Sequence, residues 1–252
     1  MEWSTMEVKR IMMPYRGNRQ RGFTVIEVML ATVIASVLVT AVYQTFHSQQ
    51  RSYLMQSGTA AMQQNLRGGI YLMNRELRSS GYNPLKAITN YVSFVTGFAA
   101  PNNQFAVNYA TDHSMVAFTL DTNGNGVIDP SSNEQIAYRF NNAAKTLERF
   151  NATKVNPADK WETVATNIDA VYFAYFDQNN TLTTNPANFR YIEVSLLARM
   201  EQQDTKYTNT TVYTNKEGVN LCPLCTGDHY HRRLLTTTIQ IRNKIFKRLT
   251  AS

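Results

Sequence analysis

The feature that most constrains this chain is an apolar run near its N-terminus, residues 23–46. The run contains no Lys, Arg or Asp, and Glu27 is its only ionisable residue. As a helix it would span roughly 36 Å, which is enough to cross a bilayer. A carboxylate at the bilayer centre costs roughly 2.5 kcal/mol or more, so Glu27 is expected to have a partner. The run therefore predicts a transmembrane helix that carries one functional carboxylate.

The segment before this run, residues 1–22, is basic. An excess of basic residues ahead of a membrane helix predicts a cytoplasmic N-terminus, with the remainder of the chain outside. After residue 46, basic and acidic residues are interspersed as on an ordinary solvated surface, so the net charge of +7 says little about nucleic acid. The charged residues of the segment are Lys9, Arg10, Arg16, Arg19 and Arg21 against Glu2 and Glu7.

The boundary between these two segments carries a family resemblance. The sequence Gly-Phe-Thr-Val-Ile-Glu-Val-Met-Leu-Ala at residues 22–31 closely resembles the class III signal of type IV prepilins and type II secretion pseudopilins. The resemblance implies that a prepilin peptidase cuts after Gly22 and N-methylates the new terminal Phe23. It also implies that Glu27 is needed for assembly. Residues 1–22 would then be a cleaved basic leader, which would be shorter if the chain started at Met12 or Met13.

Physical chemistry agrees with this role for Glu27. After cleavage, the amine of Phe23 is a cation at the end of an apolar helix, and Glu27 lies one turn further along the same face. The Glu27 of one subunit can neutralise the Phe23 amine of a neighbour, which relieves two charges that are otherwise buried alone. We therefore expect an ion pair between subunits.

Residues 47–82 are expected to continue the helix as an amphipathic half. Gly68 and Gly69 could bend it, and Gly81 with Pro84 should end it. The whole helix would be about 85 Å long and would pack on the chain's own sheet. Residues 73–82 resemble the end of this helix in PilW-like minor pilins and in the J-type pseudopilin. The apolar residues at helical spacing are Tyr53, Met55, Met62, Leu66, Ile70, Met73 and Leu77.

Residues 83–252 read as a β-rich head outside the cytoplasm. Together with the helix they predict an α+β, pilin-like fold, in which a long N-terminal helix packs on antiparallel β-sheets. Residues 232–243 again resemble PilW-like minor pilins. The strands expected from apolar and alternating patterns are residues 114–120, 135–140, 146–150, 170–176, 191–198 and 234–241, with residues 91–98 as a strand or a loop.

One stretch of the head, Asp121 to Asp129, matches the first nine positions of an EF-hand calcium loop. The pattern departs at its end: the closing glutamate would fall at Ser132, whereas Glu134 stands two residues later. Strands flank the loop in place of helices, so we expect a structural calcium site on a β-hairpin. A plain polar turn is the alternative. The expected ligands are Asp121, Asn123, Asn125, Val127, Asp129 and Glu134.

The two cysteines of the chain, Cys222 and Cys225, fall in the part expected outside the cytoplasm. We expect a disulfide between them. A zinc site with His229 and His231, or a redox dithiol, are the alternatives, although the histidine spacing is crowded and no βαβ context for a redox site is expected.

The sequence contains no catalytic motif, and we expect a protein that is not an enzyme. The resemblance favours a minor pilin that takes part in the assembly, initiation or tip of a type IV pilus. A minor pseudopilin of a type II secretion system and a tip module that binds surfaces or DNA are the alternatives. Expected partners are the prepilin peptidase, other minor and major pilin subunits, the inner-membrane assembly platform and membrane lipid; nucleic acid is not expected. The chain would span the inner membrane once, with its head in the periplasm, and then enter the pilus.

Overall fold

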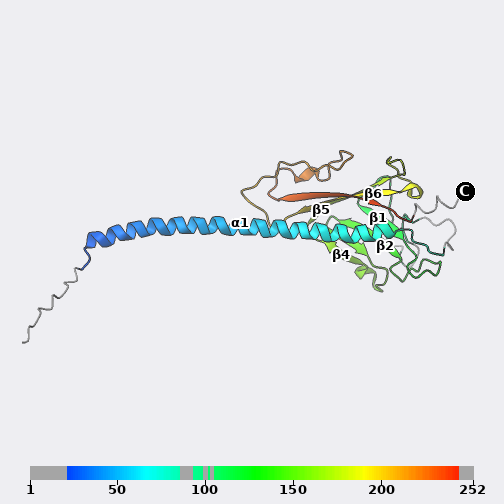
Figure 1. The fold of residues 1–252 in the computed structure, drawn as a ribbon, viewed down its shortest axis with the longest axis horizontal. Coiled ribbons are helices and arrows are strands. Elements are labelled where there is room, and N and C mark those ends of the chain that lie inside the picture. Colours follow the sequence, from blue (N-terminus) through cyan, green and yellow to red (C-terminus); the bar gives the residue numbers. More distant parts are fainter. Residues whose placement is uncertain (1–21, 86–92, 99–101, 103–104, 244–252) are drawn as a thin grey trace, which may run out of the picture. The chain divides into compact units, whose positions relative to one another are not determined.

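The computed structural model of the chain describes residues 22–85, 93–98, 102 and 105–243. It divides into two compact units, Met1–Tyr53 and Leu54–Ser252. Helix α1 (Val25–Ser79) forms most of the described part of the first unit and continues into the second. Figure 1 shows this helix in blue and cyan.

In the first unit, α1 presents its apolar side chains to the outside. Every residue from 22 to 50 is exposed. Within the described residues, α1 is the one helix that is long and apolar enough to cross a membrane, and none of its most apolar window is buried. Apolar surface on this scale needs lipid or protein to cover it. The helix expected from residue 23 onward is therefore present, and it begins at Val25.

The second unit contains two antiparallel sheets and the C-terminal part of α1. The four-stranded sheet has the order β1 (Met115–Thr119), β2 (Gln135–Asn141), β3 (Thr146–Phe150) and β4 (Trp161–Ala165). The three-stranded sheet has the order β5 (Ile168–Phe176), β6 (Tyr191–Arg199) and β7 (Arg232–Gln240). Short 3₁₀ helices lie at Pro157–Asp159, Pro186–Asn188 and Pro223–Cys225. This arrangement confirms the expected α+β fold.

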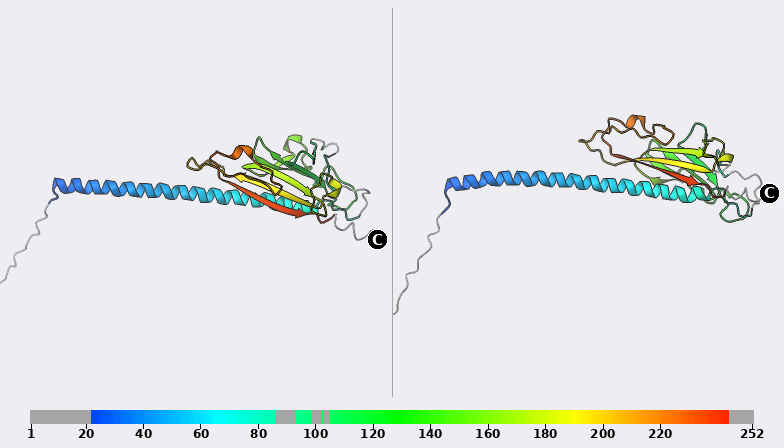
Figure 2. Two further views of the ribbon diagram at one scale, coloured as in Figure 1. Left: turned by 90° about the horizontal axis from the view of Figure 1, so that it is seen from above. Right: turned by 45° about the horizontal axis from the view of Figure 1, so that its top comes forward.

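Helix α1 packs where the two sheets meet (Figure 2). Its buried positions are Met62, Leu66, Gly69, Met73 and Leu77, which recur every three or four residues and so share one face. Gly69 lets the backbone approach both sheets. A Cβ there would lie 3.4 Å from Leu147 of β3 and 3.6 Å from Leu196 of β6. The expected amphipathic packing is confirmed, except that Tyr53 is 70% exposed.

The strands β1 and β5 connect the sheets through hydrogen bonds. The Phe173 N–H donates to the His113 carbonyl at 2.8 Å, and the Tyr175 hydroxyl donates to the Met115 carbonyl at 3.1 Å. The Tyr175 ring stacks on Phe189, with centroids 4.3 Å apart. Because these groups are buried and satisfied, they fix the two sheets around one continuous core.

The C-terminal end of α1 follows the expected signal. Gly81 has a positive φ of 75°, and the Tyr82 N–H donates back to the Ser79 carbonyl at 3.1 Å. A Cβ at Gly81 would come within 2.7 Å of the Ser93 Cβ, so a larger residue does not fit. The helix passes through Gly68 and Gly69 without interruption.

Most expected strands are present, residues 93–98 take the loop alternative, and one strand was not expected. Residues 91–92 lie outside the described residues, and residues 93–98 form a single bridge, Phe94 to Phe118, and no strand. Strand β4 has no counterpart in the sequence predictions. Its residues are half-buried at the edge of the sheet and do not alternate cleanly between apolar and polar, so the pattern that marks the other strands is missing.

Candidate functional site

The expected processing and assembly residues lie at the start of α1. The Glu27 N–H donates to the Thr24 carbonyl at 3.1 Å and to its Oγ1 at 3.3 Å, so Thr24 caps the helix. Glu27 is thereby the third helical residue, where a carboxylate interacts favourably with the helix dipole. Phe23 is 82% exposed, directly before the cap. The residues of the expected leader before Gly22 lie outside the described residues.

The residues expected to bind calcium lie in the loop between β1 and β2. Asp121 and Glu134 are both fully buried. The Asp121 carboxylate accepts the N–H groups of Gly124 at 2.7 Å and Gly126 at 2.9 Å. Both glycines have positive φ angles, which bend the loop around the carboxylate.

Glu134 closes the same loop from the other end. Its Oε1 accepts hydrogen bonds from the N–H groups of Thr122 at 2.9 Å and Asn123 at 3.2 Å, and its Oε2 accepts the Asp129 N–H at 2.8 Å. Among the described residues, no Lys, Arg or His side chain forms an ion pair with Asp121 or Glu134. The two buried carboxylates of this loop are therefore hydrogen-bonded to neutral donors alone, among the described residues.

The remaining expected ligands lie at the surface of the loop. Asn123 Oδ1 accepts the Asn125 N–H, and Asn125 Oδ1 accepts the Val127 N–H, each at 2.8 Å. Hydrogen bonds from the Ser131 N–H and hydroxyl to Asp129 lower the pKa of that carboxyl. Among the described residues, no three His, Cys, Asp or Glu side chains gather as one metal-binding group. The ligand types that the loop can supply are therefore carboxylate, amide and backbone oxygens.

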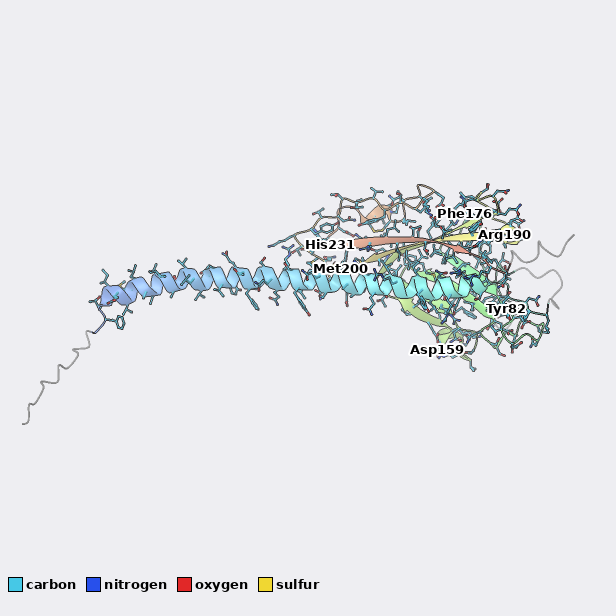
Figure 3. The ribbon with its side chains drawn as sticks, viewed as in Figure 1. Tyr82, Asp159, Phe176, Arg190, Met200 and His231 are labelled. Atoms are coloured by element: carbon cyan, nitrogen blue, oxygen red, sulfur yellow. A yellow bond between two sulfur atoms is a disulfide. The ribbon has the colours of Figure 1, made fainter. Side chains whose placement is uncertain are left out.

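Sequence reasoning missed an amide beside this loop. The Oδ1 of Asn83 is buried and has no hydrogen-bond partner among the described atoms. The chain on either side of it touches the loop: the Tyr82 carbonyl accepts the Asp121 N–H at 2.7 Å, and Pro84 lies 3.4 Å from where a Gly124 Cβ would be. Figure 3 labels Tyr82, which lies just beyond the C-terminal end of α1. The residue follows the helix-ending glycine, and no sequence pattern links it to the loop.

Cys222 and Cys225 form a disulfide, with Cα atoms 5.4 Å apart. The two nearby histidines have other partners. His229 Nδ1 interacts with the Tyr207 carbonyl, and His231 Nε2 lies 3.3 Å from Asp204 Oδ2. The four side chains considered for zinc are thus not brought together among the described residues.

The disulfide loop, residues 201–231, covers the outer face of the three-stranded sheet. Tyr213, Leu221 and Cys222 pack there against Leu197 and Leu234. His231 and Met200 mark the end of the sheet where this loop begins and ends (Figure 3), joined by the Met200 N–H to His231 carbonyl bond of 2.9 Å. The loop is therefore a packed part of the head.

An ion-pair cluster that attaches α1 to the four-stranded sheet was also missed by sequence reasoning. Glu76 accepts hydrogen bonds from Arg149 Nε at 2.9 Å and from the Tyr138 hydroxyl at 2.5 Å. Burial and the Glu76 carboxylate raise the pKa of the Tyr138 hydroxyl above its usual range. These charged and polar groups are largely shielded from water, so their mutual pairing matters to the helix–sheet contact.

An exposed apolar helix, capped at Thr24, carrying one carboxylate and preceded by a Gly–Phe pair, is the arrangement of a prepilin N-terminus. Comparison with family models agrees. The model of the prokaryotic N-terminal methylation motif matches residues 17–43, which confirms the expected class III signal. The model described as prepilin peptidase-dependent protein B matches residues 55–217. The chain therefore belongs to the prepilin peptidase-dependent protein B family.

No curated protein matches the chain. Among solved structures, the chain is similar to a type IV-like pilin from Thermus thermophilus, with 13% sequence identity and a TM-score of 0.43. That similarity covers 72% of this chain and 95% of the pilin.

Proposed function

We propose that this protein is a minor pilin-like structural subunit, without enzymatic activity, that takes part in the assembly or initiation of a type IV pilus or stands at its tip. The observation that carries the proposal is the uncovered apolar part of α1 with Glu27 in its first turn. Membership of a family named for dependence on prepilin peptidase supports it.

The proposed sequence of events uses the chain's own residues. Prepilin peptidase cuts between Gly22 and Phe23 on the cytoplasmic side and methylates the Phe23 amine. The helix holds the subunit in the inner membrane with its head in the periplasm. At the assembly platform, the helix leaves lipid for a bundle of pilin helices, where Glu27 pairs with the amine of a neighbouring subunit. That pairing offsets the cost of burying both charges.

Comparing strains with and without prepilin peptidase tests the proposal. With the peptidase, the mature chain should lack residues 1–22 and appear in the sheared pilus fraction. Without it, the full-length precursor should stay in the inner membrane and no copy should reach the fibre. Cleavage at Gly22 in the strain without the peptidase would contradict the proposal.

A minor pseudopilin of a type II secretion system is the second candidate, favoured by the resemblance of residues 73–82 to the J-type pseudopilin. Deleting the gene separates the two. Loss of surface fibres with normal protein export supports the pilus, and the reverse result supports the secretion system. A tip module that binds DNA has only the basic C-terminal tail, Lys244, Lys247 and Arg248, in its favour.

We also propose that the β1–β2 loop binds calcium as a structural cofactor. Asp121 and Glu134 are buried carboxylates paired with neutral donors alone among the described residues, and the buried Asn83 oxygen beside them has no donor. A divalent cation would offset the cost of two buried negative charges. The ion would join residues that follow α1 to the hairpin, and so stabilise the head.

A further inference from the structure

A groove of about 350 Å³ lies between the last turns of α1 and Arg242, in the segment that follows β7. We call it the arginine groove. Its two walls are held together by the Arg242 N–H to Arg78 carbonyl bond of 3.4 Å and by the Asn243 amide, which donates to the Ser79 carbonyl at 2.9 Å. The groove is lined by Tyr71, Asn74, Arg75, Arg78, Ser79 and Arg242.

The described part of the lining carries three guanidinium groups and no carboxylate. The nearest acidic side chain on the helix is Glu76, which is directed to Arg149 and Tyr138 and reaches Arg75 only at 3.6 Å. Within the described residues, no side-chain hydrogen bond or ion pair is formed by Arg78 or Arg242. Among the described residues, the positive charges of Arg78 and Arg242 in the groove are therefore uncompensated.

The helix end does not explain this charge. Cations near a helix C-terminus are usually placed to bind its free carbonyl groups. Here the Arg78 carbonyl accepts the Arg242 N–H, and the Ser79 carbonyl accepts the Tyr82 N–H and the Asn243 amide. Because these carbonyls already have donors, the guanidinium groups remain available. Clustered like charges are unfavourable unless an anion joins them.

We propose that the arginine groove docks an acidic segment of a neighbouring pilin subunit in the assembled fibre. Guanidinium groups bind carboxylates through two parallel hydrogen bonds, and a groove of this volume holds one or two such side chains. Tyr71, which is 72% exposed, offers an aromatic wall beside them. The groove lies on α1, the same helix whose N-terminal part is proposed to pack among other subunits. The inference thus rests on the proposed function.

The test places a photo-activatable phenylalanine analogue at Tyr71 of the full chain in piliated cells. After illumination, fibres are sheared and the adducts mapped by mass spectrometry. We expect an adduct to a peptide of a pilin subunit that contains Asp or Glu within a few residues of the attachment point. An adduct to nucleic acid or lipopolysaccharide, or no adduct in fibres that contain the protein, would overturn the proposal.

Charge variants supply the controls. The double variant Arg78→Gln with Arg242→Gln should lower the adduct yield at least tenfold, whereas the same positions changed to Lys should retain most of it. Arg67→Gln, an exposed helix arginine outside the groove lining, is the matched control and should change nothing. An undiminished yield in the glutamine pair would overturn the proposal.

Wild-type fibres separate the docking proposal from the proposed function. If processed protein is absent from these fibres, both proposals fail. If processed protein is present without the adduct, the docking proposal fails alone.

Discussion

Arg232 is the residue on which the polar contacts beneath the disulfide loop converge. Its side chain is 2% exposed; Nε donates to Asp169 Oδ2 at 2.7 Å, and Nη1 donates to Asp228 Oδ1 at 2.6 Å. The register of β5 shifts between Ile168 and Ala170, and this bulge lies at Asp169. One guanidinium thus joins β5, β7 and the loop.

Changing Arg232→Ala should lower the free energy of unfolding by about 3 kcal/mol, because buried Asp169 loses its shorter ion pair and keeps only Arg199, at 3.5 Å. Urea unfolding of the detergent-solubilised full chain at neutral pH measures this. Arg233→Ala, at the exposed next position, is the matched control and should stay within about 0.5 kcal/mol of wild type. Equal effects of the two variants would contradict the assignment.

The ion pair between Arg232 and Asp228 predicts that the stability of the head depends on pH. The hydrogen bond from Arg232 lowers the pKa of Asp228 below its usual value. A carboxyl with a lowered folded-state pKa stabilises the fold above its unfolded value, and this stability is lost as the pH falls through the folded value. Lowering the pH below about 4 should therefore reduce the free energy of unfolding less in Arg232→Ala than in wild type.

Glu27 is the second residue whose charge should matter. Glu27→Ala should be cut after Gly22 and inserted in the membrane, but should be missing from sheared fibres because the neighbouring amine has no partner. Glu27→Gln should behave like the alanine variant, and Glu27→Asp should retain part of the incorporation. Immunoblots of membrane and fibre fractions measure this. Normal incorporation of Glu27→Gln would remove the charge-pairing account.

At the scale of elements, the contact between α1 and the two sheets depends on Gly69. Gly69→Leu should lower the melting temperature by an amount equivalent to roughly 1–3 kcal/mol, because its side chain would overlap Leu147 and Leu196. Gly68→Leu is the matched control: nothing lies within 4 Å of its Cβ position, and leucine forms helix better than glycine. Gly68→Leu should therefore melt at the wild-type temperature or higher. A tolerated leucine at Gly69 would contradict the close packing.

The β1–β2 loop gives the second prediction at this scale. Calcium at millimolar concentration should raise the melting temperature of the full chain relative to chelator, because an ion that binds only the folded state stabilises it. Asp129→Asn keeps an oxygen for the Ser131 donors but removes a charge, and should reduce the rise. The same melting temperature with calcium and with chelator would count against the site.

Several elements could be predicted from sequence because their patterns are local. The apolar run predicted the start of α1, and the alternating residues of β2 and β3 predicted the hairpin that these two strands form. The position of the Asp121 loop could also be predicted, because strand patterns at residues 114–120 and 135–140 flank it. Strand β4 could not be predicted, because its edge position leaves it half-exposed and without a clear pattern.

Across the whole molecule, the other features missed are those made by residues distant in sequence. Arg242 joins Arg78 only because the end of β7 reaches the end of α1, and Arg149 meets Glu76 only because α1 crosses the four-stranded sheet. The sequence shows which of these residues are basic or acidic, but it does not show which of them contact each other in the fold. The N-terminal signal could be recognised from sequence because Gly22, Phe23 and Glu27 lie within six consecutive residues, and the roles expected of these three residues stay predictions.

The central claim is that cutting at Gly22 converts a membrane anchor into a fibre subunit. Mass spectrometry of sheared, washed fibres tests it most directly. The account predicts an N-terminal peptide of this chain that begins at Phe23 and carries one methyl group on its amine. A fibre-associated chain that still contains residues before Phe23, or fibres made by the same cells that contain none of this protein, would contradict it.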